Sequence, residues 1–444
     1  MVRKTRKQRL TIVYPRCAGI DIGSREHWVA VDPEECDEPV RCFSTFSDDL
    51  YALADWLQSF QIEVVAMEAT GVYWIPLYEV LDSCGFEVNL VNSRATRQVS
   101  GRKSDVLDCQ WIRQLMSYGL LKGAFRPPDE ICPLRALVRQ RATKVADQSR
   151  CIAHMQKALT QMNVQLDNVV SDLMGKTGMA ILRSIVAGER NPKQLATLRD
   201  RRLRADEETV ARSLYGNWRA EHLFALSQAL AHYDFLNDQI AACDEQIIES
   251  LSALPVRTEE TTAPVKRLAG QHRTVAQQKD LHQALQRVMG VDLTAIPTIG
   301  IETTLVLASE IGPDLDLFPS EKNFCSWLTV APPTHISGGK PVPGKKQKVF
   351  NRAGQALRQA ASNARSSDSF IGASHRARLA RMDSKPAIKA TAHQLARLIY
   401  AMLTKGQPYV EQGIEAFEDL TKDRQIRALQ RKAHKLGFTL SEAA

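Results

Sequence analysis

The stretch Cys17-Ala18-Gly19-Ile20-Asp21-Ile22-Gly23 decides the fold of this chain. It predicts a short buried strand that is apolar on both faces, carries one carboxylate in its middle and ends in a tight turn. An ionised carboxylate inside an apolar strand is costly unless it is paired or binds a metal ion. Asp21 is therefore the first candidate for a functional residue.

The segments after this strand predict an α/β domain. Three closely spaced strands suggest an antiparallel meander, and helical and strand-like segments then alternate. The expected strands are 17–23, 27–32, 41–47, 62–67 and 86–91, and the expected helices are 49–60, 75–84 and about 104–118. The order β-β-β-α-β-α-β-α is that of the ribonuclease-H-like fold. The remainder of the chain predicts mainly helices, so the expected fold class is α/β followed by α.

Length and composition exclude several classes of protein. A chain of 444 residues is too long for one ordinary core, and 44% hydrophobic with 24% charged residues is typical of a globular protein. The apolar runs are far shorter than a membrane span, and the basic N-terminus is not followed by the apolar stretch of a secretory signal. Nine scattered cysteines without a Cys-x-x-Cys pair indicate a reducing compartment. We expect no membrane contact and a cytoplasmic location.

Positive charge is concentrated in one segment, residues 340–405. It holds fourteen Lys and Arg residues against two acids, a net charge of +12, whereas the whole chain has +8. A basic run is often only a solvated face, but this concentration favours a polyanionic partner, and nucleic acid is the first choice.

Proline pairs and polar stretches suggest the domain boundaries. The two long helices expected at 134–162 and 221–254 are consistent with an intermolecular coiled coil and equally with an intramolecular hairpin; Asn237 and Asp244 interrupt the apolar stripe of the second. Near 288–312 a Pro-x-x-Gly turn between helices predicts a helix-hairpin-helix, which can present backbone N–H groups to a DNA phosphate. The predicted segments are a basic N-terminal arm (1–16), a catalytic domain (17–125), a helical or coiled-coil linker (134–287), a C-terminal domain with the helix-hairpin-helix and a Ser-Gly-Gly loop (288–410), and a helical tail (411–444).

Three further acids accompany Asp21. Glu68 ends the strand at 62–67, and Asp105 and Asp108 are spaced to project from one face of a helix. In a ribonuclease-H-like sheet these positions converge, and four acids would repel one another without a cation. Ligands that supply only oxygen suit Mg²⁺ or Mn²⁺, and two such ions about 3.5–4 Å apart would clamp the attacking and leaving oxygens of a phosphodiester.

The motifs together resemble the DEDD transposases of bacterial insertion sequences, the insertion-sequence one-ten family, to which the Piv DNA invertases are related. The matching stretches are Gly19-Ile20-Asp21-Ile22-Gly23, Met67-Glu68-Ala69-Thr70-Gly71, Arg102-Lys103-Ser104-Asp105-Val106-Leu107-Asp108, Ile296-Pro297-Thr298-Ile299-Gly300 and Ser337-Gly338-Gly339-Lys340. Each is weak alone, but their order and spacing are specific.

This resemblance implies more than the residues show by themselves. It implies a first domain like the Holliday-junction resolvase RuvC, with Asp21, Glu68, Asp105 and Asp108 as metal ligands, and a serine nucleophile in the second domain, which we place at Ser337. It also implies double-stranded donor and target DNA, a structured guide (bridge) RNA, and a homodimer or homotetramer. The residues expected to bind nucleic acid are Arg102, Lys103, Lys340, Lys345, Lys346, Lys348, Arg352 and Arg358.

The loop around Ser337 has its own interpretation from the residues. His335-Ile336-Ser337-Gly338-Gly339-Lys340 predicts a flexible loop with a hydroxyl, a nearby cation and bare backbone that a phosphate can approach. Such a loop is ordinarily only a turn. A free serine also needs an activator, which acids from the first domain could supply in a composite site.

Three other functions compete with a recombinase. A RuvC-like metal-dependent endonuclease or junction resolvase would use water and form no covalent intermediate. Asp21-Ile22-Gly23-Ser24 also resembles the first phosphate loop of actin-like ATPases, but the second Asp-x-Gly strand and the adenosine-binding glycines that they need are missing. A non-catalytic nucleic-acid scaffold would tolerate loss of the Asp21 carboxylate. The motifs favour the recombinase.

Overall fold

The computed structural model describes residues 11–69, 71–91, 105–262, 273–332, 334–337, 340–343, 351–406, 408–409 and 412–439. The chain divides into two compact units, Met1–Arg126 and Pro127–Ala444. Most of the basic arm predicted at 1–16 lies outside the described residues, and the division of the second unit into separate domains stays a prediction.

The first unit is built on a five-stranded sheet in the order β3-β2-β1-β4-β5. Strands β1 and β2 and strands β2 and β3 pair antiparallel, which confirms the predicted meander. Strand β4 pairs parallel with both β1 and β5. The strands are β1 (Cys17–Ile22), β2 (Glu26–Ala30), β3 (Val40–Ser44), β4 (Val64–Glu68) and β5 (Glu87–Val91).

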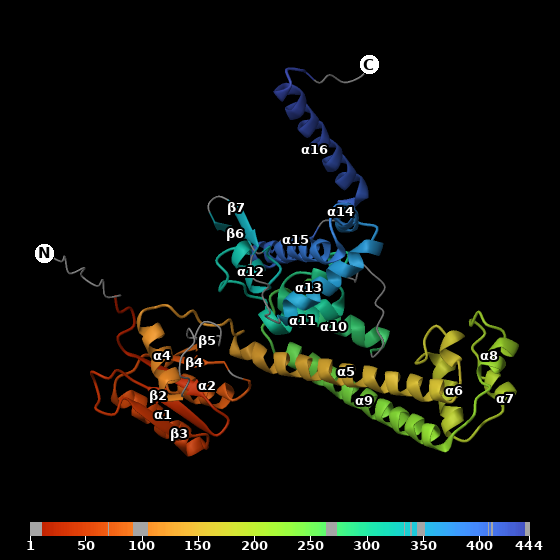
Figure 1. Cartoon of the computed structure of the whole chain (residues 1–444), viewed down its shortest axis with the longest axis horizontal. Coiled ribbons are helices and arrows are strands. Elements are labelled where there is room, and N and C mark those ends of the chain that lie inside the picture. The colour runs from red at the N-terminus through yellow and green to blue at the C-terminus, as the bar shows by residue number, and fades with distance from the viewer. Residues whose placement is uncertain are drawn as a thin grey trace. The chain divides into compact units, whose positions relative to one another are not determined.

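Helices cover both faces of this sheet (Figure 1). Alternate residues of β1 explain why, since Ala18, Ile20 and Ile22 pack with the helices of one face, and Cys17 packs with Ile112 on the other. The helices are α1 (Ser47–Ser59) and α2 (Trp74–Ser83) on the first face and α4 (Asp105–Ser117) on the second. The predicted order of strands and helices is confirmed, and the sheet order is consistent with the ribonuclease-H-like fold.

A long helical hairpin begins the second unit. Helices α5 (Cys132–Gln161) and α9 (Ala220–Ser252) pack along their length, and α6 (Lys176–Val186), α7 (Pro192–Ala196) and α8 (Glu207–Ser213) lie at the far end (Figure 1). Of the two arrangements that the sequence allows, the structure shows the intramolecular hairpin.

Polar residues in the α9 stripe are paired with α5 and with the residues before α10. Asn237 accepts a hydrogen bond from Gln148 of α5 at 2.6 Å. Asp244, only 2% exposed, is held by Arg141 and Arg273. A buried polar pair of this kind fixes the register of a helical hairpin, because any slip would leave a charge or an amide without its partner.

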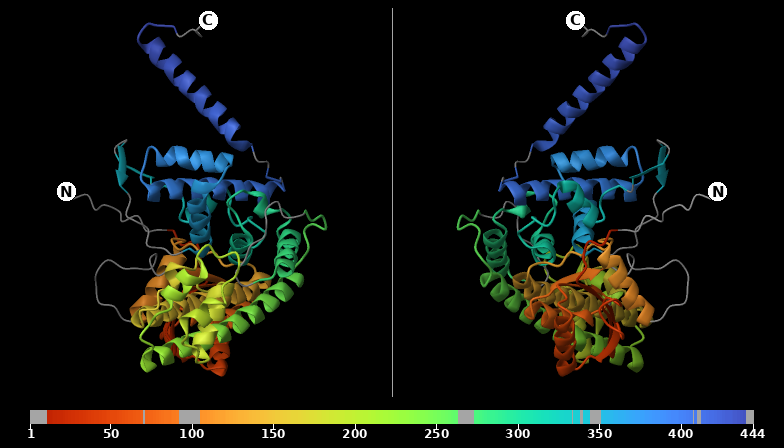
Figure 2. Two further views of the ribbon diagram at one scale, coloured as in Figure 1. Left: turned by 90° about the vertical axis from the view of Figure 1, so that its right-hand side faces the viewer. Right: turned by 90° about the vertical axis from the view of Figure 1, so that its left-hand side faces the viewer.

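Where the structure describes it, the rest of the second unit consists mainly of packed helices, with a β-hairpin beside them (Figure 2). Gly354 lets α13 approach closely, since an added Cβ there would lie 2.0 Å from the carbonyl oxygen of Leu328. The elements are α10 (Val275–Met289), η3 (Leu293–Ala295), α11 (Ile301–Ile311), α12 (Glu321–Trp327), β6 (Thr334–Ser337), β7 (Lys340–Pro343), α13 (Arg352–Ser362), η4 (Asn363–Ser366), α14 (Phe370–Leu379), α15 (Ser384–Lys405) and α16 (Gly413–Lys435).

The predicted helix-hairpin-helix differs in detail from the structure. The Pro-x-x-Gly turn lies before α11 as expected, but the first helix is α10, which ends at Met289, and η3 stands between. The amino end of α11 also carries Glu302, whose carboxylate pairs with Arg141 at 3.2 Å and with Arg273. A phosphate at this end would meet that negative charge, so its role in phosphate binding stays a prediction.

No described helix has the length and apolar character that crossing a membrane requires.

Candidate active site

Strand register brings Asp21 and Glu68 to neighbouring positions. In the parallel pair β1–β4, Ile20 is the partner of Met67, so the next residues along the two strands are Asp21 and Glu68. Both side chains are half-buried. They lie on the α4 face of the sheet, because Ile20 and Met67 pack on the opposite face and side chains alternate along a strand. The sequence prediction that these two acids lie together is supported at the level of the backbone.

Helix α4 runs antiparallel to β1 at very close range. The Cys17 thiol lies 3.7 Å from the carbonyl oxygen of Arg113, whereas Gly19 faces both Arg113 and Cys109. A Cβ added to Gly19 would lie 2.3 Å from the Arg113 nitrogen and 2.4 Å from the Cys109 oxygen. The amino end of α4, which starts at Asp105, therefore lies beyond the carboxyl end of β1, where Asp21 is found.

The pKa values of two cysteines show which acids lie near them. Burial raises the pKa of the Cys109 thiol to about 12, and the negative charges of Asp21 and Asp108 add to the rise. Burial also raises the pKa of the Cys42 thiol to about 11, with contributions from Glu26 and from Asp105. Asp21 and Asp108 thus act on one buried thiol, whereas Asp105 acts on a thiol of β3.

The four acids do not form a closed ligand group as their side chains are placed. Among the described residues, no three His, Cys, Asp or Glu side chains lie together closely enough to hold a metal ion. The donor chemistry nevertheless fits Mg²⁺ or Mn²⁺, since all four are carboxylates at one end of β1, β4 and α4. Glu68 and Asp108 are half-buried and Asp105 is exposed. These side chains would have to rotate in order to bind one ion together.

An ion pair that sequence analysis missed fixes α4 in place. The Arg113 guanidinium donates to the Asp32 carboxylate just after β2, and both side chains are largely shielded from solvent, at 14% and 25% exposed. Arg113 also forms part of the surface that touches Gly19. The signal in the sequence was slight: a glycine in a strand often marks the close approach of another backbone.

The Ser337 region is a β-hairpin, so the prediction of an open, flexible loop is wrong for its flanks. Ser337 ends β6, Lys340 begins β7, and the two are paired across the hairpin. Gly338 and Gly339, the two residues that connect the strands, lie outside the described residues. The pairing fixes the backbone of Ser337, which a nucleophile benefits from.

The predicted nucleic-acid contacts are only partly within the described residues. Arg102, Lys103, Lys345, Lys346 and Lys348 lie outside them. Arg352 is exposed and starts α13. Arg358 is half-buried, donates to Thr329 Oγ1 at 3.3 Å, and has a pKa lowered by burial.

Cations gather around α13, α14 and α15 beyond those that the sequence singled out. Arg378 donates to two neutral acceptors, Thr391 Oγ1 at 2.8 Å and Gln394 Oε1 at 2.7 Å. Burial lowers the pKa of Arg378, and burial together with Arg358 lowers that of Lys389. Burial and the charges of Arg378, Arg365 and Arg376 also lower the pKa of His375. Both acceptors are neutral, so they do not balance the positive charge of Arg378. This charge favours a polyanion at this face.

Comparison with protein families identifies both ends of the chain. A model of the DEDD transposase of IS110 elements, described as a transposase, matches residues 18–164. A second, described as the transposase of the IS116/IS110/IS902 family, matches residues 292–374. The search of curated proteins found no match. The two family matches together cover just over half of the chain, and the first includes Asp21, Glu68, Asp105 and Asp108. The chain belongs to the IS110 family of insertion-sequence transposases.

Proposed function

We propose that this transposase cuts and rejoins DNA with two divalent ions held by Asp21, Glu68, Asp105 and Asp108, in a domain that works as RuvC-like nucleases do. The observation that carries the proposal is the placement of Asp21 beside Glu68 on the face covered by α4, whose amino end carries the other two acids. Bound Mg²⁺ or Mn²⁺ supplies charge neutralisation at the phosphodiester oxygens.

The residues of the chain hold the acids in place. Asp21 is fixed by its position between Ile20 and Ile22, which are buried at 0% and 4% exposed. The close contact of Gly19 with α4 and the Arg113–Asp32 ion pair fix the helix that carries Asp108. Pre-positioned carboxylates reduce the reorganisation that the reaction would otherwise demand.

Ser337 is the proposed nucleophile of strand exchange. Its Oγ forms a bond to the DNA phosphorus, the bond from that phosphorus to the departing DNA oxygen breaks, and the serine proton passes to the departing oxygen. The covalent phosphodiester conserves the bond energy for rejoining, and attack by a DNA hydroxyl reverses the step. The family match over 292–374 includes Ser337, and the hairpin pairing fixes its backbone, which supports the assignment.

The proposed partners are donor and target DNA duplexes together with a structured guide RNA. Lys340, Arg352 and Arg358 contact nucleic acid, as do Arg102, Lys103, Lys345, Lys346 and Lys348. The support is the +12 charge of residues 340–405 and the cations gathered around α13 to α15. Because exchange requires two duplexes, the active form is a homodimer or homotetramer located on the bacterial nucleoid.

The decisive experiment compares two matched carboxylates at the two ends of β4. Full-length Glu68→Gln is expected to lose DNA strand cleavage at saturating Mg²⁺, whereas Glu63→Gln, at an exposed glutamate paired with Arg16, keeps it. Equal activity of the two variants would contradict the role of Glu68.

The serine assignment has its own test. Wild-type protein mixed with end-labelled DNA and then denatured is expected to retain label, and Ser337→Ala is expected to lose it, while Ser362→Ala, at the half-buried last residue of α13, retains it. Cleaved DNA without retained label in the wild type would instead indicate a water-using endonuclease or junction resolvase.

A further inference from the structure

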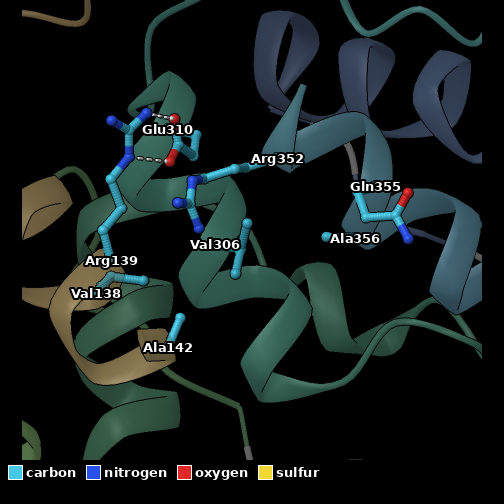
Figure 3. A pocket seen from close by; sticks show the side chains of 8 residues that line it. All are labelled: Val138, Arg139, Ala142, Val306, Glu310, Arg352, Gln355 and Ala356. Carbon is cyan, nitrogen blue, oxygen red and sulfur yellow. Dashed lines mark hydrogen bonds and ion pairs between the residues drawn. The ribbon is translucent and has the colours of Figure 1, made fainter. Parts of the chain in front are cut away.

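A cavity of about 230 Å³ lies within the second unit between α5, α11 and α13 (Figure 3). Its walls are aliphatic and come from Val138 and Ala142 of α5, Val306 of α11 and Ala356 of α13. A cavity of roughly 150 Å³ accepts one benzene ring, and drug-sized ligands need about 300–1,000 Å³. The space therefore suits one planar heterocycle.

The polar side of the cavity is rich in arginine. Glu310, 5% exposed, accepts hydrogen bonds from Arg139 at 2.7 and 2.8 Å and from Arg135 at 3.0 Å. Arg352 extends from α13 toward Arg139, whereas Gln355, which also lines the cavity, points away from these two arginines (Figure 3). Arg135 and Arg139 both pair with this one carboxylate, so together they carry one more positive charge than it balances.

Electrostatics agree with this arrangement. Burial alone would raise the pKa of Glu310, but the Arg139 hydrogen bond and the charges of Arg135, Arg139 and Arg352 lower it below its usual range. Burial lowers the pKa of Arg135, and the like charge of Arg139 adds to this effect against the attraction of Glu310. Crowded cations beside an open cavity are stabilised by an external anion.

We propose that this cavity takes one unpaired nucleotide of bound DNA, turned out of the duplex. The base lies between the aliphatic walls, and its phosphate lies against Arg352 and Arg139. An aliphatic slot beside surplus positive charge matches a nucleotide, which joins an apolar ring to a phosphate, better than it matches a bare anion or an apolar ligand. Arg352 also starts a helix within the basic segment 340–405, so DNA on that segment would reach it.

This proposal rests on the proposed function, because it requires that the second unit bind DNA. The experiment measures the Kd of the full-length chain for three DNA duplexes of equal length: one fully paired, one with a single bulged base, and one with an abasic bulge. Wild type is expected to bind the base bulge about ten-fold more tightly than the paired duplex, the equivalent of about 1.4 kcal/mol. The abasic bulge is expected to bind like the paired duplex.

Two variants fill the cavity from opposite walls. Ala356→Phe and Ala142→Phe stand at half-exposed and exposed positions, so the added ring enters the cavity without displacing the core. Each is expected to reduce the preference for the base bulge to less than roughly two-fold while leaving the Kd of the paired duplex unchanged. Gln359→Phe, at an exposed position of α13 outside the cavity, keeps the preference.

The outcomes separate this inference from the function on which it rests. If the chain binds none of the duplexes, the proposed DNA binding itself fails. If it binds them but shows no preference for the base bulge, or if both filling variants keep that preference, the cavity is not a nucleotide site. The same measurement is made with an RNA duplex that carries one bulged base. If the cavity variants abolish the preference for the bulge in RNA and not in DNA, the assignment to DNA is wrong.

Discussion

Asp21 and Glu68 stand one residue beyond the Ile20–Met67 pair of two parallel strands, on the sheet face that α4 covers. The four acids of this transposase are thus arranged by three separate features: a strand register, a helix antiparallel to β1, and a glycine that lets the two approach. The glycine and the helix each lead to a test of their own.

Gly19→Ala is expected to destabilise the first unit by about 1–3 kcal/mol, the usual cost of overpacking. The added methyl would lie within 2.4 Å of backbone atoms of Cys109 and Arg113, which a side-chain rotation does not relieve. Chemical denaturation measures the change. Gly300→Ala is the control, since a Cβ there meets nothing within 4 Å, and equal stability of the two variants would refute the close contact.

Arg113→Ala is expected to cost about 1.5–3 kcal/mol of unfolding free energy, since it leaves the half-buried Asp32 carboxylate without its charged partner. The exposed pair Arg16–Glu63 provides the comparison, and Arg16→Ala is expected to cost less than about 1 kcal/mol. A double-mutant cycle with Asp32→Ala isolates the interaction. A coupling energy near zero would show that Arg113 does not fix α4 through Asp32.

Asp244→Ala is expected to lower the free energy of unfolding by about 3–5 kcal/mol. It removes the α9 carboxylate with which the buried Arg141 and Arg273 pair. Thermal unfolding of the full chain measures it. Asp238→Ala, an exposed position on the same helix, is expected to change stability little. If the two substitutions had similar effects, the buried ion pairs would not determine how α5 and α9 pack.

Stability is expected to fall above about pH 9 through Cys17 and Cys109. Burial raises the pKa of Cys17 to about 11 and that of Cys109 to about 12, from an ordinary value near 9. Above pH 9 the unfolded thiols lose protons that the folded thiols keep, so the unfolded state is favoured by up to about 1.4 kcal/mol per pH unit for each group.

The Cys17→Ala/Cys109→Ala variant isolates this effect. Its unfolding free energy, measured by denaturant titration from pH 7 to 11, is expected to decline less steeply than that of the wild type. Parallel declines would show that the two thiols ionise in the folded protein as they do when unfolded.

Periodicity predicted the first unit well because its physical signals are local. The apolar alternation around Asp21, the β-branched strand that ends at Glu68 and the acids at Asp105 and Asp108 each report on a short segment. Their convergence followed from strand and helix order alone. The orientation of the carboxylates did not, since it depends on side-chain rotation at the start of α4.

Other features depend on contacts between distant segments, and the sequence did not predict them. The Asp32–Arg113 pair joins residues 81 positions apart. In the sequence, Asp244 is only an interruption of an apolar stripe, because its partners Arg141 and Arg273 lie far from it along the chain. The cavity near Glu310 requires the packing of three helices. Two glycines in a short polar stretch are typical of a loop and of a hairpin alike, so the sequence predicts a loop at Ser337 where the structure has the pair β6–β7.

The most direct test of the central claim is a structure of the full-length protein with Mn²⁺, solved with the anomalous scattering of that ion. Two peaks are expected about 3.5–4 Å apart, with the Asp21 carboxylate and at least one of Glu68, Asp105 and Asp108 as ligands. Peaks elsewhere, or well-ordered density that shows Asp21 bound to no ion at saturating Mn²⁺, would contradict a metal-dependent reaction at these acids.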